Sequence, residues 1–179
     1  MVTGVLHLTQ SGHFTAALGM TFDQLRKTQG NTADDKPGYS HGYHQLIDGV
    51  VEAERLGFHS IFLVEHHFTG SAQISASLNL LTFLAARTST IRLGTAVIVV
   101  PWHNPVLLAE QAATLDVLSN GRLDLGVGKG YRPNEFERFC VPLEEASERF
   151  EESMALFRKA LTSDTRFSHH SKRWKFEDI

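Results

Sequence analysis

The sequence lacks the features that would mark a secreted, membrane-embedded or nucleic-acid-binding protein. One cysteine among 179 residues rules out an internal disulfide framework and favours a reducing, cytoplasmic setting. There is no apolar run of about 18 residues and no basic, apolar leader, so we expect neither a membrane span nor a secretory signal. The 17 basic residues do not exceed the 20 acidic ones, which gives nucleic-acid binding no electrostatic support. We interpret Cys140 as a buried or half-buried small hydrophobe, with a catalytic thiol as the alternative.

Short apolar runs alternate with amphipathic stretches four times along the chain, as in a parallel sheet with helical crossovers. Two α/β architectures fit this order: an open doubly wound sheet, or half of a TIM-type (β/α)8 barrel, which needs about 250 residues when whole. We expect residues 1–179 to form a single domain. The predicted strands are 4–8, 61–64, 91–100 and 122–127, and the predicted helices are 42–56, 74–88, 105–118 and 142–161.

Two polar segments stand outside this alternation. Residues 9–39 form a long connection after the first strand, and we interpret it either as a lid over the sheet's end or as a disordered insertion. The tail after residue 161 has few apolar residues, although Trp174–Phe176 could begin another strand.

The candidate chemistry follows strand ends, where α/β proteins gather ligands and catalytic groups. Glu65, His66 and His67 come directly after the apolar run 61–64. Because side chains alternate along a strand, we expect one of the two histidines to face a pocket. Adjacent histidines are a poor metal signature, and we find no convincing metal set. His7 could face the same end of the sheet, or could simply be tucked into the first strand.

Two further strand ends carry small residues. Gly94–Ala96 would let a flat ring approach the backbone, or would let sheet and helix pack closely. Gly126, Gly128 and Gly130 alternate around Lys129, which suits a phosphate or simply makes a tight turn. The spacing matches neither a P-loop nor the dinucleotide-binding fingerprint.

Longer segments resemble a known family. EHHFTG, GTAVIVVPWHNPVLLAEQAATLDVLSNGRLDLGVGKG and the region of PNEFERF are similar to bacterial luciferase-like, flavin-dependent monooxygenases, over most of residues 42–161. The resemblance implies a (β/α)8 barrel that binds reduced FMN from a separate flavin reductase. It also implies O2-dependent oxygenation of a small organic substrate, which in bacterial luciferase is a long-chain aldehyde. Coenzyme F420 is an alternative cofactor, because relatives of this fold use it.

The resemblance also implies roles for individual residues. His66 aligns with the family's catalytic histidine, an acid/base near the flavin, and Glu65 with a carboxylate lining the flavin site. Ala96–Val97 matches a position where backbone packs against the flavin ring, often through a non-prolyl cis peptide. Lys129 stands where luciferase has an arginine that helps to bind the flavin phosphate, and Gly128 where luciferase has a reactive cysteine. Thiol chemistry at that position is therefore absent, which favours a generic family member over a true luciferase.

The chain is the N-terminal half of the barrel that the resemblance implies. Four parallel strands leave two unpaired edges, so we expect a homo-oligomer in which a second copy covers the exposed layer. Two functions remain open. The chain is either a flavin-dependent monooxygenase, whole or truncated, or a catalytically silent half-barrel that binds flavin weakly or serves only as a subunit.

Overall fold

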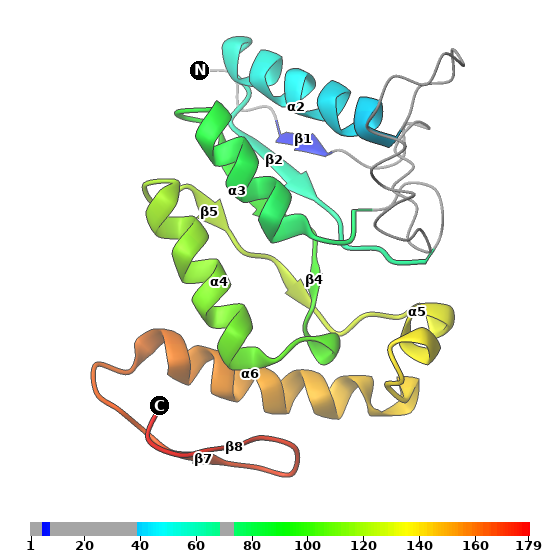
Figure 1. The fold of residues 1–179 in the computed structure, drawn as a ribbon, viewed down its shortest axis with the longest axis vertical. Coiled ribbons are helices and arrows are strands. Elements are labelled where there is room, and N and C mark those ends of the chain that lie inside the picture. Colours follow the sequence, from blue (N-terminus) through cyan, green and yellow to red (C-terminus); the bar gives the residue numbers. More distant parts are fainter. Residues whose placement is uncertain (1–4, 8–38, 69–73) are drawn as a thin grey trace.

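A computed structural model describes residues 5–7, 39–68 and 74–179 (Figure 1). Almost all of the predicted lid or insertion at 9–39 lies outside these residues. The His7 side chain also lies outside the described part, so the two interpretations of His7 stay predictions. None of the helices in the described ranges is long and apolar enough to cross a membrane. The strands are β1 (Val5–His7), β2 (Ser60–Leu63), β3 (Arg92–Thr95), β4 (Ile98–Val99), β5 (Leu123–Asp124), β6 (Val127–Gly128), β7 (His169–His170) and β8 (Lys175–Phe176). The α-helices are α2 (Tyr39–Arg55), α3 (Ser77–Arg87), α4 (Pro105–Leu118), α5 (Pro133–Arg138) and α6 (Ala146–Thr162), with short 3-10 helices at Val100–Trp102 and Leu143–Glu145.

The main sheet is parallel, with strand order β1-β2-β3-β5. Strands β4 and β6 continue β3 and β5 and pair with each other, also in parallel. Successive strands are neighbours and each is joined to the next by a helix, so the sheet is one part of a (β/α)8 barrel. The half-barrel prediction is therefore confirmed, and the doubly wound alternative is not needed.

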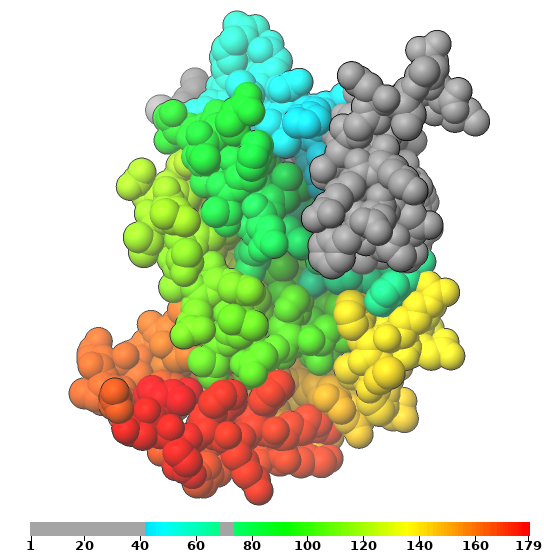
Figure 2. Space-filling view, viewed as in Figure 1, coloured from blue at the N-terminus to red at the C-terminus, as the bar shows by residue number. Residues whose placement is uncertain are grey.

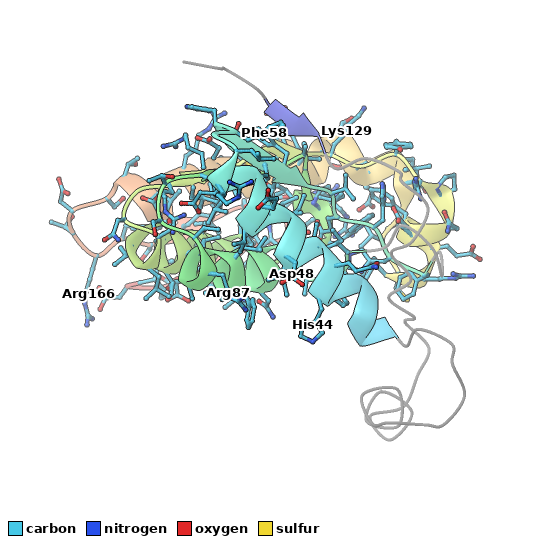
Figure 3. The ribbon with its side chains drawn as sticks, turned by 90° about the horizontal axis from the view of Figure 1, so that it is seen from above. His44, Asp48, Phe58, Arg87, Lys129 and Arg166 are labelled. Atoms are coloured by element: carbon cyan, nitrogen blue, oxygen red, sulfur yellow. The ribbon has the colours of Figure 1, made fainter. Side chains whose placement is uncertain are left out.

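The two faces of the sheet differ in chemistry. Ile61, Leu63 and Leu93 are fully buried and join the main apolar core with residues of the covering helices. The alternate positions carry Phe62, whose ring covers Gly94 on the neighbouring strand, and Arg92, whose guanidinium binds Asp124 through two hydrogen bonds of 2.6 and 2.8 Å. In Figure 3 the helices that carry His44, Asp48 and Arg87 lie on one side of the sheet, and Lys129 lies on its other side.

Two predicted strands are each broken in two. The run 91–100 divides into β3 and β4 at a cis peptide bond between Ala96 and Val97, and the run 122–127 divides into β5 and β6. Both breaks occur side by side, where Ile98 N and Thr95 Oγ1 both donate to the carbonyl of Gly126. The apolar run 91–100 does not indicate its break, because Thr95 and Ile98 on either side of Ala96–Val97 are both buried.

The helices agree with the prediction most closely where the capping signal is strongest. Asn104 caps α4 by accepting hydrogen bonds from Val106 N (3.0 Å) and Leu107 N (3.2 Å), and Pro105 takes the first helical position, as predicted. The boundaries of the other three predicted helices shift by one to four residues, and the last of them begins as the 3-10 turn Leu143–Glu145. The six-residue α5 was not predicted. Cys140, two residues after it, is exposed with a φ of 55°, so the interpretation of a buried thiol was wrong.

The C-terminal segment forms an antiparallel hairpin of β7 and β8, not a further strand of the barrel. Lys175–Phe176 is a strand, as the sequence suggested, but its partner is the adjacent His169–His170. The hairpin lies against α6 (Figure 2). The Arg173 guanidinium holds it there through hydrogen bonds to three acidic side chains of the helix region, Glu145, Glu148 and Glu152.

Candidate active site

Three chain segments meet at the carboxyl end of the parallel sheet. Ala96 N donates to Leu63 O (2.7 Å), which joins the end of β3 to the end of β2. Glu65 Oε2 accepts from Val99 N (2.6 Å), and Gly128 lies opposite Val99 in the β4–β6 pair. The structure therefore brings together the regions of His66, Ala96–Val97 and Gly128, which are up to 62 positions apart in the sequence.

Glu65 is a buried carboxylate engaged by three donors. It is 3% exposed, and besides Val99 N it binds His103 Nε2 (2.8 Å) and His67 Nε2 (3.2 Å), both through Oε1. Burial alone would raise its pKa, but the hydrogen bonds from His103 and His67 outweigh burial and lower the pKa to about 2. Glu65 is thus ionised at neutral pH, and its contacts within this chain are with β4 and two imidazoles. The flavin contact implied for it stays a prediction.

His66 is paired with a second buried carboxylate. Its Nδ1 lies 3.2 Å from Glu135 Oε1, and the same oxygen accepts from His67 N (2.9 Å). Burial, reinforced by the positive charge of Arg132, lowers the pKa of His66, although the Glu135 carboxylate opposes this shift. The His66 imidazole is therefore neutral at neutral pH, and its side chain keeps 21% exposure.

The two histidines have different surroundings. His67 is 8% exposed, and its ring packs edge-on against Phe139 (4.7 Å between centroids) and Trp102 (5.4 Å). Its Nε2 is bound to Glu65, so His67 belongs to the packing between this segment and α5. His66 is the more exposed of the pair and the better placed to meet a ligand.

The cis peptide marks the most accessible part of a buried stretch. Within residues 93–100 only Ala96 and Val97 are partly exposed. Behind them, a Cβ added to Gly128 would lie 2.7 Å from Val97 Cγ2, and one added to Gly126 would lie 2.1 Å from Thr95 O. Gly126 and Gly128 are therefore required because they pack closely against residues 95–97. The sequence had suggested other reasons for these glycines, namely a phosphate contact or a tight turn.

Lys129 is exposed, and its Nζ donates to Ser147 Oγ (3.1 Å) in the first turn of α6. A lysine on the side of the sheet away from α2, α3 and α4 (Figure 3) fits the phosphate end of a cofactor.

Sequence reasoning missed two members of the site, His103 and Glu135. His103 lies three residues after the end of the predicted strand 91–100. The same rule that singled out Glu65, which looks for polar side chains after strand ends, could therefore have found it. Glu135 sits 69 positions from His66 in a helix of six residues, and no spacing rule links the two. Within the described ranges, no group of three or more His, Cys, Asp or Glu side chains is placed to hold a metal ion.

Comparison with known proteins identifies the family. The sequence model of the luciferase-like monooxygenases matches residues 20–179. The chain belongs to the luciferase-like monooxygenase family. Among curated relatives, the oxygenase component of a flavin-dependent trigonelline monooxygenase from Acinetobacter baylyi is 33% identical over 138 residues, which is 74% of this chain and 38% of that protein.

Solved structures of two monooxygenases have the same fold. A monooxygenase from Streptomyces bottropensis superposes with a TM-score of 0.74 and 30% identity, over 78% of this chain and 43% of that one. The oxygenating constituent of 3,6-diketocamphane monooxygenase from Pseudomonas putida, solved with FMN, gives a TM-score of 0.71 at 23% identity, over 75% and 38% of the two chains. This chain thus spans about two-fifths of the length of these three proteins.

Proposed function

We propose that this chain forms the flavin-binding end of a monooxygenase that uses reduced FMN and O2 to oxygenate a small organic substrate. The observation that carries this proposal is the meeting of His66, Ala96–Val97 and Gly128–Lys129 at one end of the sheet. Each of these segments comes from a different strand end. A site built this way is the usual ligand position of a (β/α)8 fold.

The residues fit such a cofactor in two places. The partly exposed Ala96–Val97 backbone would offer a flat surface to the flavin ring, and Lys129 would hold the phosphate. Reduced flavin, when bound, supplies the electrons that activate O2 for transfer of one oxygen atom to the substrate. His66, neutral and partly exposed, would accept or return a proton at the ring's edge.

Partners follow from the same proposal. A chain that uses reduced FMN needs a flavin reductase to supply it, and the relative from Acinetobacter baylyi is described as an oxygenase component. Residues 123–128 of β5 and β6 are all only partly buried, as expected for a sheet edge that another strand would cover. In this proposal a second copy of the chain covers this edge. Both the protein and the reductase are in the cytoplasm.

Flavin titration of the purified protein tests the proposal. We expect quenching of tryptophan fluorescence at micromolar FMN or, under anaerobic conditions, reduced FMN. Binding of F420 in preference to both flavins would instead favour the F420-dependent alternative. No binding of either cofactor up to millimolar concentration would leave only the catalytically silent half-barrel.

A variant separates binding from catalysis. His66→Ala should retain flavin affinity but lose formation of the oxygenated product from reduced FMN and a long-chain aldehyde, provided that the unaltered protein turns this probe over. Product formation by the variant at the unaltered rate would contradict the role proposed for His66.

A further inference from the structure

We propose that Glu135 is a positioning residue that keeps the proton of the neutral His66 ring on Nδ1, which leaves Nε2 as the basic nitrogen. This inference rests on the proposed function in one respect only, namely that His66 accepts or returns a proton.

Glu135 is a buried acidic residue. It is 2% exposed although it carries a carboxylate, and a buried charge is costly unless hydrogen bonds compensate for it. Its donors come from the segment that follows β2: His66 through the ring and His67 through the backbone N–H, both to Oε1. Glu135 is therefore held by the same residues that it orients.

The same contacts determine the tautomer. An ionised carboxylate only accepts hydrogen bonds, so the ring nitrogen facing Glu135 must be the one that carries the hydrogen. That nitrogen is Nδ1, at 3.2 Å from Oε1. The remaining nitrogen of the neutral ring, Nε2, then carries a lone pair and no hydrogen. A carboxylate that fixes the tautomer of a neighbouring histidine also orients the ring and supports its protonated form.

The helix that carries Glu135 is fastened to the histidine segment at a second point. Arg138 donates to Phe68 O (2.9 Å) and lies over the Phe68 ring, and Phe139 packs against both Phe68 and His67. These contacts limit how far α5 can shift from residues 66–68. The carboxylate is consequently held at a fixed position relative to the imidazole.

Other charged groups face His66 as well, and they determine what removing Glu135 would do. Arg132, at the start of α5, and the neighbouring His67 both disfavour a positive charge on the His66 ring, whereas Glu135 favours one. Without the carboxylate, the titration of His66 should move further below its usual range.

Two variants separate the charge of Glu135 from its hydrogen bond. Glu135→Gln keeps an oxygen that can accept from Nδ1 but removes the charge, and Glu135→Leu removes both. The matched control is Glu137→Gln, an exposed glutamate of the same helix. Nitrogen-15 NMR of the histidine rings in the full, flavin-free chain reports the tautomer and the titration midpoint of His66 directly.

We expect unaltered His66 to be protonated at Nδ1 and unprotonated at Nε2 when neutral. In Glu135→Gln this tautomer should persist with a lower titration midpoint, and in Glu135→Leu the tautomer should be lost or mixed. Glu137→Gln should leave both properties unchanged. An Nε2–H tautomer in the unaltered chain, or a midpoint that Glu135→Gln does not lower, would overturn the proposal. Because no flavin is present, failure here is distinguishable from failure to bind flavin, and the Gln variant keeps the test valid if the Leu variant does not fold.

Discussion

The Glu65 carboxylate and the backbone N–H of Val99 lie 2.6 Å apart and join the end of β2 to the start of the segment after the cis peptide. Glu65 is next to His66 in sequence, and Val99 follows Ala96–Val97 by two residues. One buried carboxylate therefore fixes the positions of both the proposed catalytic histidine and the proposed ring-facing backbone. Disturbing this contact should affect stability and site geometry together.

Replacement of Glu65 by glutamine should destabilise the protein. The amide oxygen can still accept one or two of the three hydrogen bonds, but the charge is lost and a buried donor is left unsatisfied. We expect a loss of about 2–3 kcal/mol in the free energy of unfolding at pH 7, measured by urea denaturation. Glu110→Gln, an exposed glutamate on α4, is the control and should change stability little. A Glu65→Gln protein as stable as the control would show that the three contacts do not stabilise the fold.

The contribution of Glu65 should also depend on pH in a defined direction. Its pKa in the folded protein is about 2, below the ordinary value of 4.5, so the stabilisation is complete above pH 4.5 and is lost as pH falls toward 2. At about 1.4 kcal/mol per unit, the shift corresponds to about 3 kcal/mol. The stability difference between unaltered and Glu65→Gln proteins should shrink across that window. A difference that stayed constant from pH 6 to pH 2.5 would contradict the lowered pKa.

Sequence patterns predicted the parts of this fold whose signals are local. The Asn104–Pro105 start of α4 depends on two adjacent residues, and the parallel sheet depends on alternation along the chain. The break at Ala96–Val97 was accessible only through family resemblance, because a run of apolar residues reads the same for cis and trans peptides.

The candidate site was predicted less completely than the fold, for a physical reason. Glu135 enters the site from a six-residue helix with only two buried residues, which is too short to show a helical apolar stripe. Its contact with His66 is tertiary, so the residues next to either of them in the sequence do not indicate the contact. The two-residue strand β7 was missed for a similar reason, and so was its pairing with β8.

Lys129 should discriminate between flavins with and without a phosphate. If its ammonium group contacts the phosphate, Lys129→Met should weaken FMN binding by about tenfold, the value of one charge-assisted contact near 1.4 kcal/mol, and should leave riboflavin binding unchanged. Lys175→Met, an exposed lysine of the hairpin, is the control. Equal losses for FMN and riboflavin would place Lys129 away from the phosphate.

Arg122 should be important for stability and irrelevant to chemistry. Its buried guanidinium donates to the carbonyls of Ala85 (2.9 Å), Thr88 (3.2 Å) and Ser119 (2.7 Å), which places a positive charge at the C-terminal ends of α3 and α4. Arg122→Ala leaves these carbonyls without their donors, and we expect a loss of about 3 kcal/mol by urea denaturation. Arg166→Ala, which removes an exposed ion pair, should cost at most about 1 kcal/mol. Similar losses for the two variants would refute this role.

A crystal structure of the protein with FMN tests most directly whether the three strand ends form one flavin site. We predict that the flavin ring lies against Ala96–Val97 with His66 at its edge and the phosphate near Lys129. A ring bound at any other surface, or a protein without FMN after exposure to millimolar concentrations, would contradict the account.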